Sequence, residues 1–193
     1  MFIRKFIAVA ATAWCLCWSL PAAANTQYKL DVSGMHASIN FKVNHLGYSW
    51  VLGRFDKFDG EFTYNPEQLK QSKIAINIKT NSVNSNHSLR DSHLRGKKFL
   101  DAKQYPEAKF VSTGIKPIDD NNFELIGNFT LKDVTKKIVI RCQKIGHGKD
   151  PWGGYRAGFT GSTEIKLTDF HVSPVGLSTT AQIELHVEGV RSS

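Results

Sequence analysis

Apolar and polar residues alternate along most of the chain with a period of two. In the stretch 36–64, Ile39, Phe41 and Val43 are separated by polar residues, the chain turns at 45–47, and an aromatic-rich segment follows. Because alternate side chains of a strand point to opposite faces, this pattern predicts two antiparallel strands, each half-buried. The many rings of this ribbon must then line either a packed core or an apolar ligand cavity.

The same alternation returns in short segments separated by Gly, Asn and Asp turns. We predict further strands around 28–32, 74–78, 110–115, 123–131, 138–145, 155–167 and 182–188. Many short strands with such turns are typical of an antiparallel sandwich or barrel. The chain contains no linker, composition break or internal repeat, so we expect one all-β domain over residues 25–193.

Two segments break the strand pattern. Residues 66–70 are expected to form one helical turn. Residues 86–96 are expected to form a short helix, with Asn86 as N-cap and Gly96 just after its last turn. The fold class predicted from the pattern is therefore all-β with one or two short helices.

The first 24 residues have the composition of a secretory signal peptide. Arg4 and Lys5 precede an apolar run, and Pro21 precedes the small residues 22–24. We expect cleavage after Ala24 and an exported chain. The bulky residues before Cys15 and Cys17 argue against a lipoprotein anchor.

Charge and cysteine content narrow the function classes. Lysine and arginine number 25 against 17 acidic residues, and removing Arg4 and Lys5 with the leader lowers the net charge from +8 to +6. The basic residues are scattered and no nucleic-acid motif accompanies them, so we expect no nucleic-acid partner. A modest positive field favours anionic partners such as phosphorylated lipid head groups, or merely gives solubility. Cys142 is left alone after cleavage and is predicted to be a small buried hydrophobe on a strand.

The best candidate for catalysis or metal binding is the cluster His87, Arg90, Asp91 and His93. Its two histidines do not share a helix face, and no ligand motif or nucleophile elbow completes it. A structural interpretation is an Arg–Asp pair with capping contacts that hold the helix across a sheet end. A functional one is that Arg90 and the histidines donate to a polar ligand head. His36 and His45, at the two ends of the first long strand, are interpreted as hydrogen-bonded turn residues.

An eight-stranded barrel can fill with side chains or hold one small ligand, and periodicity alone does not separate the two. The residues themselves, however, resemble a known family. Asp31, His36, His45-Leu46-Gly47 and Phe58-Asp59-Gly60 resemble the opening pattern of the YceI family, and 90–112 and 127–139 resemble its later segments. The match extends over the whole chain, although His171-Val172 stands where the family often has glycine.

The resemblance implies an extended, lipocalin-like, eight-stranded antiparallel barrel with a long apolar tunnel. It also implies a periplasmic protein that binds a polyisoprenoid lipid, such as an isoprenoid quinone or a prenyl pyrophosphate, without transforming it and without a required cofactor or metal. We predict cavity liners among the aromatic ribbon and head-group contacts near the short helix. The candidate ligand-binding residues are Phe41, His45, Tyr48, Trp50, Leu52, Phe55, Phe58, Arg90, Asp91, His93 and Phe99.

Two alternative functions stay open at this point. The chain could be an enzyme acting on a lipid pyrophosphate through the cluster 87–93. It could be a filled barrel whose outer surface docks another envelope protein. Transient contact with a membrane and a homodimer through exposed strand or helix surface are also open.

Overall fold

The computed structural model describes residues 25–174 and 178–192; the predicted signal peptide lies outside them. The described part is mostly antiparallel strand, with one α-helix and three 3-10 turns. The elements are β1 Thr26–Leu30, β2 Ser38–His45, β3 Ser49–Phe55, β4 Phe58–Tyr64, η1 Leu69–Gln71, β5 Lys73–Lys79, η2 Thr80–Ser82, β6 Val83–Asn84, α1 Ser88–Leu94, β7 Glu107–Pro117, β8 Asn122–Leu131, β9 Val134–Lys149, β10 Tyr155–Lys166, η3 Leu167–Phe170 and β11 Thr180–Arg191.

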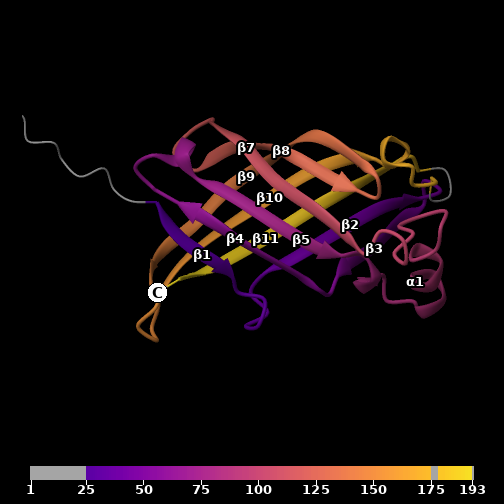
Figure 1. Cartoon of the computed structure of the whole chain (residues 1–193), viewed down its shortest axis with the longest axis horizontal. Helices are drawn as coiled ribbons and strands as arrows, with labels where there is room; N and C mark the ends of the chain where they lie inside the picture. Colours follow the sequence, from indigo (N-terminus) through magenta and orange to yellow (C-terminus); the bar gives the residue numbers. More distant parts are fainter. Residues whose placement is uncertain (1–24, 175–177, 193) are drawn as a thin grey trace, which may run out of the picture.

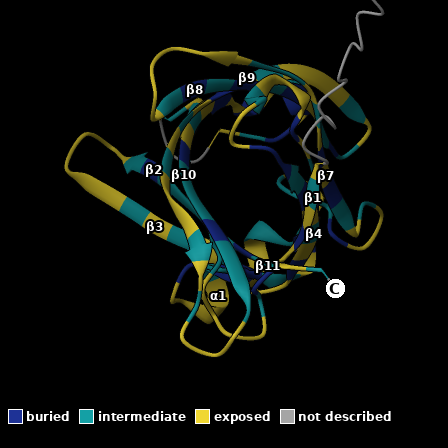
Figure 2. Cartoon of the chain, turned by 90° about the vertical axis from the view of Figure 1, so that its left-hand side faces the viewer, coloured by how far each residue is buried: buried dark blue, intermediate teal, exposed yellow. Residues whose placement is uncertain are grey.

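The strands close into a barrel. The hydrogen-bonded order runs β1-β4-β5-β7-β8-β9-β10-β11, and β11 returns to β1. Figure 2 shows the barrel viewed along its axis. Closure gives each of these eight strands a partner on both sides. The expected eight-stranded antiparallel barrel is confirmed.

Three of the eight strands in the ring are interrupted, so that each consists of two shorter strands in line. β11 pairs with β1 through Gly189–Arg191 and with β2 through Gln182–His186, so β1 and β2 follow one line interrupted by residues 31–37. In the same way β3 and β4 lie in line, and β6 continues β5. The interruptions let the β2–β3 hairpin turn away from the ring, as Figure 2 shows.

The barrel has two distinct ends, which we call the α1 end and the C-terminal end (Figure 1). At the α1 end, the chain after α1 and the turn η3 bring apolar side chains over the interior. Phe170, 2% exposed, packs edge-on against Phe129 of β8 with ring centroids 5.4 Å apart. At the C-terminal end lie the start of β1 and the last residues of β11.

The predicted short helix forms, with one correction at its start. α1 covers Ser88–Leu94, and its N-cap is His87, whose Nδ1 accepts from the Arg90 backbone N–H at 3.2 Å. Asn86 was predicted to be the cap, but its backbone is left-handed (φ 61°), one residue too early. The expected turn at 66–70 forms slightly later, as η1. Within the described ranges no helix combines the length and apolar character needed to span a membrane.

Candidate functional site

The barrel encloses an apolar cavity of about 200 Å³. Every position in the ring contributes inward-facing side chains to it, because each strand presents alternate residues to the interior. An apolar cavity of this order stays dry and accepts apolar ligands. The main lining side chains are Ile39, Phe41, Val43, Phe55, Phe62, Tyr64, Leu69, Ile74, Ile76, Ile78, Leu94, Phe99, Leu100, Phe110, Phe123, Leu125, Phe129, Leu131, Ile138, Ile140, Cys142, Phe159, Ile165, Leu167, Val172, Ile183, Leu185 and Val187.

The lining follows the length of the barrel. Leu94, Leu100 and Val172 line it from the α1 end, and Tyr64 and Val187 line it toward the other end. Phe159 of β10 contacts three rings from β4 and β8, with its centroid 5.7 Å from Phe62, 5.2 Å from Tyr64 and 6.1 Å from Phe123, all edge-on. A narrow cavity that extends along the barrel suits a slender chain better than a bulky ring system.

Phe41 and Phe55 both line the cavity, as predicted from the ribbon. Their rings are 5.8 Å apart, and Phe41 lies flat over Gly53, its direct partner across β2 and β3. A Cβ added at Gly53 would stand 2.2 Å from Phe41 Cζ. The glycine therefore gives the ring room to lie against the wall instead of across the cavity.

Gly53→Ala is expected to push the Phe41 ring into the cavity and to destabilise the fold by about 1 kcal/mol, a typical overpacking cost. Urea unfolding measures the stability. Gly148→Ala on β9, where nothing lies within 4 Å of an added Cβ, is the matched control and should be neutral or slightly stabilising. Equal stability changes in the two variants would contradict the assigned role of Gly53.

Two more predicted residues are partly or fully buried, but only one lines the cavity. Phe99, in the segment after α1, lines it. Phe58 is 9% exposed and belongs to the main core cluster opposite Ile78, outside the cavity wall. Phe58 shares the inner face with Ile78 but packs in the core beside the cavity, so it supports the barrel without lining the cavity.

The prediction that Tyr48, Trp50 and Leu52 line the interior is wrong. Their exposed fractions are 89%, 48% and 64%. Trp50 and Leu52 differ from Phe55 by an odd number of residues, so a period of two places them on the opposite face. They lie on the outer side of the β2–β3 hairpin, where Lys42 covers the Trp50 ring at 5.1 Å.

The predicted polar contacts also lie away from the cavity wall. His45 is exposed at the hairpin turn, where its carbonyl accepts from the Tyr48 N–H at 3.0 Å. Arg90 donates through Nε and Nη2 to the hydroxyl and carbonyl of Ser85. Asp91 accepts from the Ser85 N–H at 2.7 Å and from its hydroxyl. His93 is exposed, and of the α1 residues only Leu94 lines the cavity.

Arg90 and Asp91 therefore connect α1 to the strand before it, which is close to the structural interpretation of the cluster. Their common partner is Ser85, rather than each other. Burial opposes ionisation of Asp91, but the two hydrogen bonds from Ser85 outweigh it and lower the pKa of this carboxyl. A carboxylate held in this way is a structural anchor for the helix.

Sequence reasoning missed most of the cavity wall because it concentrated on the 36–64 ribbon. The missed residues share a signal that was available: inward-facing alternation on the other strands. Ile74, Ile76 and Ile78 on β5 and Leu125, Phe129 and Leu131 on β8 show it clearly.

Cys142 lies on a strand, as predicted, and is partly buried there. Its side chain lines the cavity from β9. Burial raises the pKa of the thiol to about 12. The thiolate, which is the reactive form, is thus scarce at neutral pH.

In the chain from Asn25 onward, we expect Cys142 to react with a water-soluble disulfide reagent at pH 8 far more slowly than after unfolding in urea. With a pKa of about 12, about one thiol in ten thousand is ionised at that pH. Absorbance of the released thiolate follows the reaction. The double variant Cys142→Ser, Ser162→Cys moves the thiol to the outer face of β10 and should react quickly. Native labelling of Cys142 as fast as unfolded labelling would contradict its burial in the wall.

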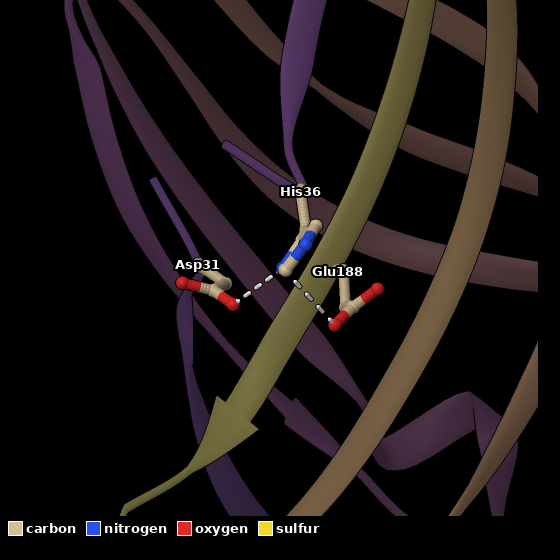
Figure 3. A group of neighbouring side chains, drawn as sticks. All are labelled: Asp31, His36 and Glu188. Atoms are coloured by element: carbon tan, nitrogen blue, oxygen red, sulfur yellow. Dashed lines mark hydrogen bonds and ion pairs between the residues drawn. The ribbon is translucent and has the colours of Figure 1, made fainter. Parts of the chain in front are cut away.

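A second group of polar residues surrounds the break between β1 and β2. Figure 3 shows Asp31, His36 and Glu188, whose candidate ligand atoms all lie within 4.8 Å of one another. His36 Nδ1 is 2.9 Å from Asp31 Oδ2, which confirms its interpretation as a hydrogen-bonded turn residue. Arg156 Nη1 donates to the same Asp31 oxygen at 2.5 Å and to Glu188 at 2.6 Å. The guanidinium therefore already supplies the positive charge that a metal ion would bring.

A closed antiparallel barrel of eight strands around an apolar cavity defines a lipocalin-like fold. The sequence profile of the YceI-like domain matches residues 28–189. The chain belongs to the YceI family, as the motif resemblance predicted. It is 50% identical over 174 residues to a UPF0312 protein of Vibrio cholerae, covering 90% of this chain and 92% of that one.

Another UPF0312 protein, from Azotobacter vinelandii, is 44% identical over 191 residues, covering 98% of this chain and 99% of the relative. Solved structures agree on the fold. BcnA of Burkholderia cenocepacia superimposes with a TM-score of 0.74 at 22% identity, over 82% of this chain and 98% of its own. A domain from Saccharophagus degradans, described as polyisoprenoid-binding, gives 0.65 at 15% identity, over 88% and 100%.

Proposed function

We propose that this protein binds one long isoprenoid chain inside the barrel and carries or sequesters it in the periplasm without transforming it. The observation that carries the proposal is the apolar cavity, which is lined by strands all around the ring and extends toward both ends. The polyisoprenoid-binding description of the Saccharophagus degradans domain, which shares this fold, supports the choice of ligand. The periplasmic location rests on the signal-peptide pattern of residues 1–24.

Chain burial gives enough free energy for tight binding. Moving hydrocarbon out of water yields roughly 0.8 kcal/mol per CH₂ before costs. At about 0.3 kcal/mol per heavy atom after costs, every ten carbons that enter the barrel add about 3 kcal/mol, which is a factor of about 100 in affinity. Polar groups then need only orient the head group.

An enzyme acting on a lipid pyrophosphate is less well supported. That activity requires the cluster 87–93 to face the reacting head group. Arg90 and Asp91 instead bond to Ser85, and neither they nor His93 line the cavity. The enzyme hypothesis predicts turnover in vitro that His93→Ala abolishes while binding persists.

Native mass spectrometry of protein purified from its own periplasm tests the proposal. We expect a stoichiometric added mass whose fragmentation identifies an isoprenoid lipid. Repeated recovery of ligand-free protein that takes up no added isoprenoid would overturn carriage. Recovery of a chemically altered lipid after incubation would favour the enzyme instead.

A further inference from the structure

Three tyrosines from distant parts of the chain meet at the C-terminal end of the barrel. They are Tyr28 on β1, Tyr64, the last residue of β4, and Tyr155, the first residue of β10. Tyr28 stacks on Phe62 at 5.0 Å, and Tyr64 lies edge-on to Phe159 at 5.2 Å. We call these three residues the tyrosine cluster.

The hydroxyls of Tyr28 and Tyr64 are unusual. The two residues are only 2% and 3% exposed, and a buried phenol normally finds a hydrogen-bond partner. Within the described ranges neither hydroxyl has a hydrogen-bond partner, yet neither oxygen is sealed from solvent, because the only sealed and unpaired side-chain atom there is Ser192 Oγ. Two otherwise buried side chains therefore keep hydroxyl groups that solvent or a ligand can reach.

The tyrosine cluster lies next to the cavity, and basic side chains surround it. Tyr64 itself lines the cavity. The His147 ring lies 5.5 Å from Tyr64 and 6.5 Å from Tyr155. The Arg191 guanidinium stands 5.6 Å over the Tyr155 ring, and Arg191 is the direct partner of Tyr28 across β1 and β11.

The phenols remain donors at physiological pH. Burial is the main cause that raises the pKa of Tyr28 and of Tyr64, and neighbouring tyrosines raise both further. A ligand at this end thus meets protonated hydroxyls, with a permanent positive charge on Arg191 close by.

We propose that the tyrosine cluster, with Arg191, binds the polar head group of a lipid whose apolar chain occupies the cavity. The chemistry it fits is a cluster of oxygen acceptors at the end of a long chain. A prenyl pyrophosphate and an isoprenoid quinone both present such oxygens. The inference rests on the proposed function and moves the head group from Arg90 and His93 to the opposite end of the barrel.

The charge of Arg191 distinguishes the two candidate ligands, a prenyl pyrophosphate and an isoprenoid quinone. A pyrophosphate carries full negative charge and gains from the guanidinium, whereas a quinone carbonyl needs only neutral donors. The hydroxyls serve either ligand, so replacing them weakens both. Replacing the arginine weakens the phosphate ligand alone.

The test uses three C20 probes with the chain from Asn25 onward: geranylgeranyl pyrophosphate, menaquinone-4, which carries a C20 side chain, and phytane, a hydrocarbon without a head group. Tyr64→Phe and Tyr28→Phe remove only a hydroxyl each, and Tyr48→Phe, on the exposed outer hairpin, is the matched control. Affinity is measured by displacement of a fluorescent chain probe. Each cluster variant is expected to bind both head-grouped ligands up to about tenfold more weakly, the loss of one hydrogen bond (~1.4 kcal/mol). Phytane binding and the control should not change.

Arg191→Gln then assigns the source. A loss of about tenfold for the pyrophosphate alone indicates a phosphate head group. No loss for either ligand overturns the assigned contact of Arg191 and leaves the hydroxyls as a site for a neutral, quinone-type head group. If wild-type protein binds no phytane, the proposed chain binding itself fails. If phytane binds but the Tyr→Phe variants bind all three probes like wild type, or lose affinity for all three equally, the head-group site is wrong.

Discussion

Tryptophan in place of Ala108 or Ala181 is expected to abolish uptake of a long isoprenoid chain. Ala108 on β7 and Ala181 on β11 are 3% and 5% exposed, and both line the cavity. Both positions lie at the α1 end of the cavity wall, so an indole there blocks the part of the cavity that the far end of a long chain must enter. Since affinity comes from carbons buried in sequence along the barrel, an obstruction excludes every carbon beyond it.

The expected loss is at least 100-fold in affinity, because excluding about ten carbons at about 0.3 kcal/mol each removes about 3 kcal/mol. Titration with geranylgeraniol or a longer prenol, followed by displacement of a fluorescent chain probe, measures it. Ala75→Trp is the matched control, because Ala75 lies on the outer face of β5 next to the inward Ile76.

Overpacking also costs stability, typically about 1–3 kcal/mol. The comparison therefore requires that each variant unfold cooperatively in urea and remain folded at the titration temperature. Using two positions on different strands guards against the failure of one variant to fold. Wild-type affinity in a folded Ala108→Trp and a folded Ala181→Trp would show that the chain does not occupy this cavity.

The fold was predictable because its signal is local. A period of two on Ile74–Ile78 or Phe123–Leu131 identifies a strand whose one face is buried, whatever the rest of the chain does. Turn residues between such runs then favour antiparallel neighbours. The number of strands in the ring and its closure came from the family resemblance, since the strand from 26 to 45 is broken at residues 31–37 and has no single periodic signature.

The site was less predictable, for two physical reasons. A period of two places Trp50 and Leu52 on the face opposite Phe55, but both faces of this strand carry large apolar side chains, so composition alone does not tell which face is the inner one. The tyrosine cluster depends on long-range closure: Tyr28 and Tyr155 are neighbours only because β1, β10 and β11 reach the same end. No local pattern joins them.

Asp31→Asn is expected to lower the free energy of unfolding by about 2 kcal/mol at pH 7, the cost of leaving buried partners poorly satisfied. Asp31 is 8% exposed and sits where β1 stops. Its carboxylate accepts from the Gly34 N–H at 2.9 Å, from His36 and from Arg156. The loop 31–37 is thus folded around one charge, and that loop holds β1 and β2 in line along β11.

The pH dependence distinguishes loss of charge from loss of shape. Hydrogen bonds from His36, then from Arg156, hold the pKa of Asp31 well below its usual range. A carboxyl whose pKa is lower when folded contributes stability that is fully present above its unfolded value, about 3.9, and is lost as the pH falls toward the folded value. The difference between wild type and Asp31→Asn should therefore be largest near neutrality and shrink below about pH 4.

Urea unfolding of both proteins at pH 7 and pH 3 measures this difference, and the other carboxyls cancel because both proteins share them. Asp120→Asn, in the exposed β7–β8 turn, is the control and should change stability by less than about 0.5 kcal/mol at either pH. Arg156 also binds Asp150 and Glu188, so the network keeps part of its charge pairing when Asp31 is neutral. A stability difference that is equal at the two pH values would mean that the side-chain shape of Asp31, and not its charge, holds the broken strand together.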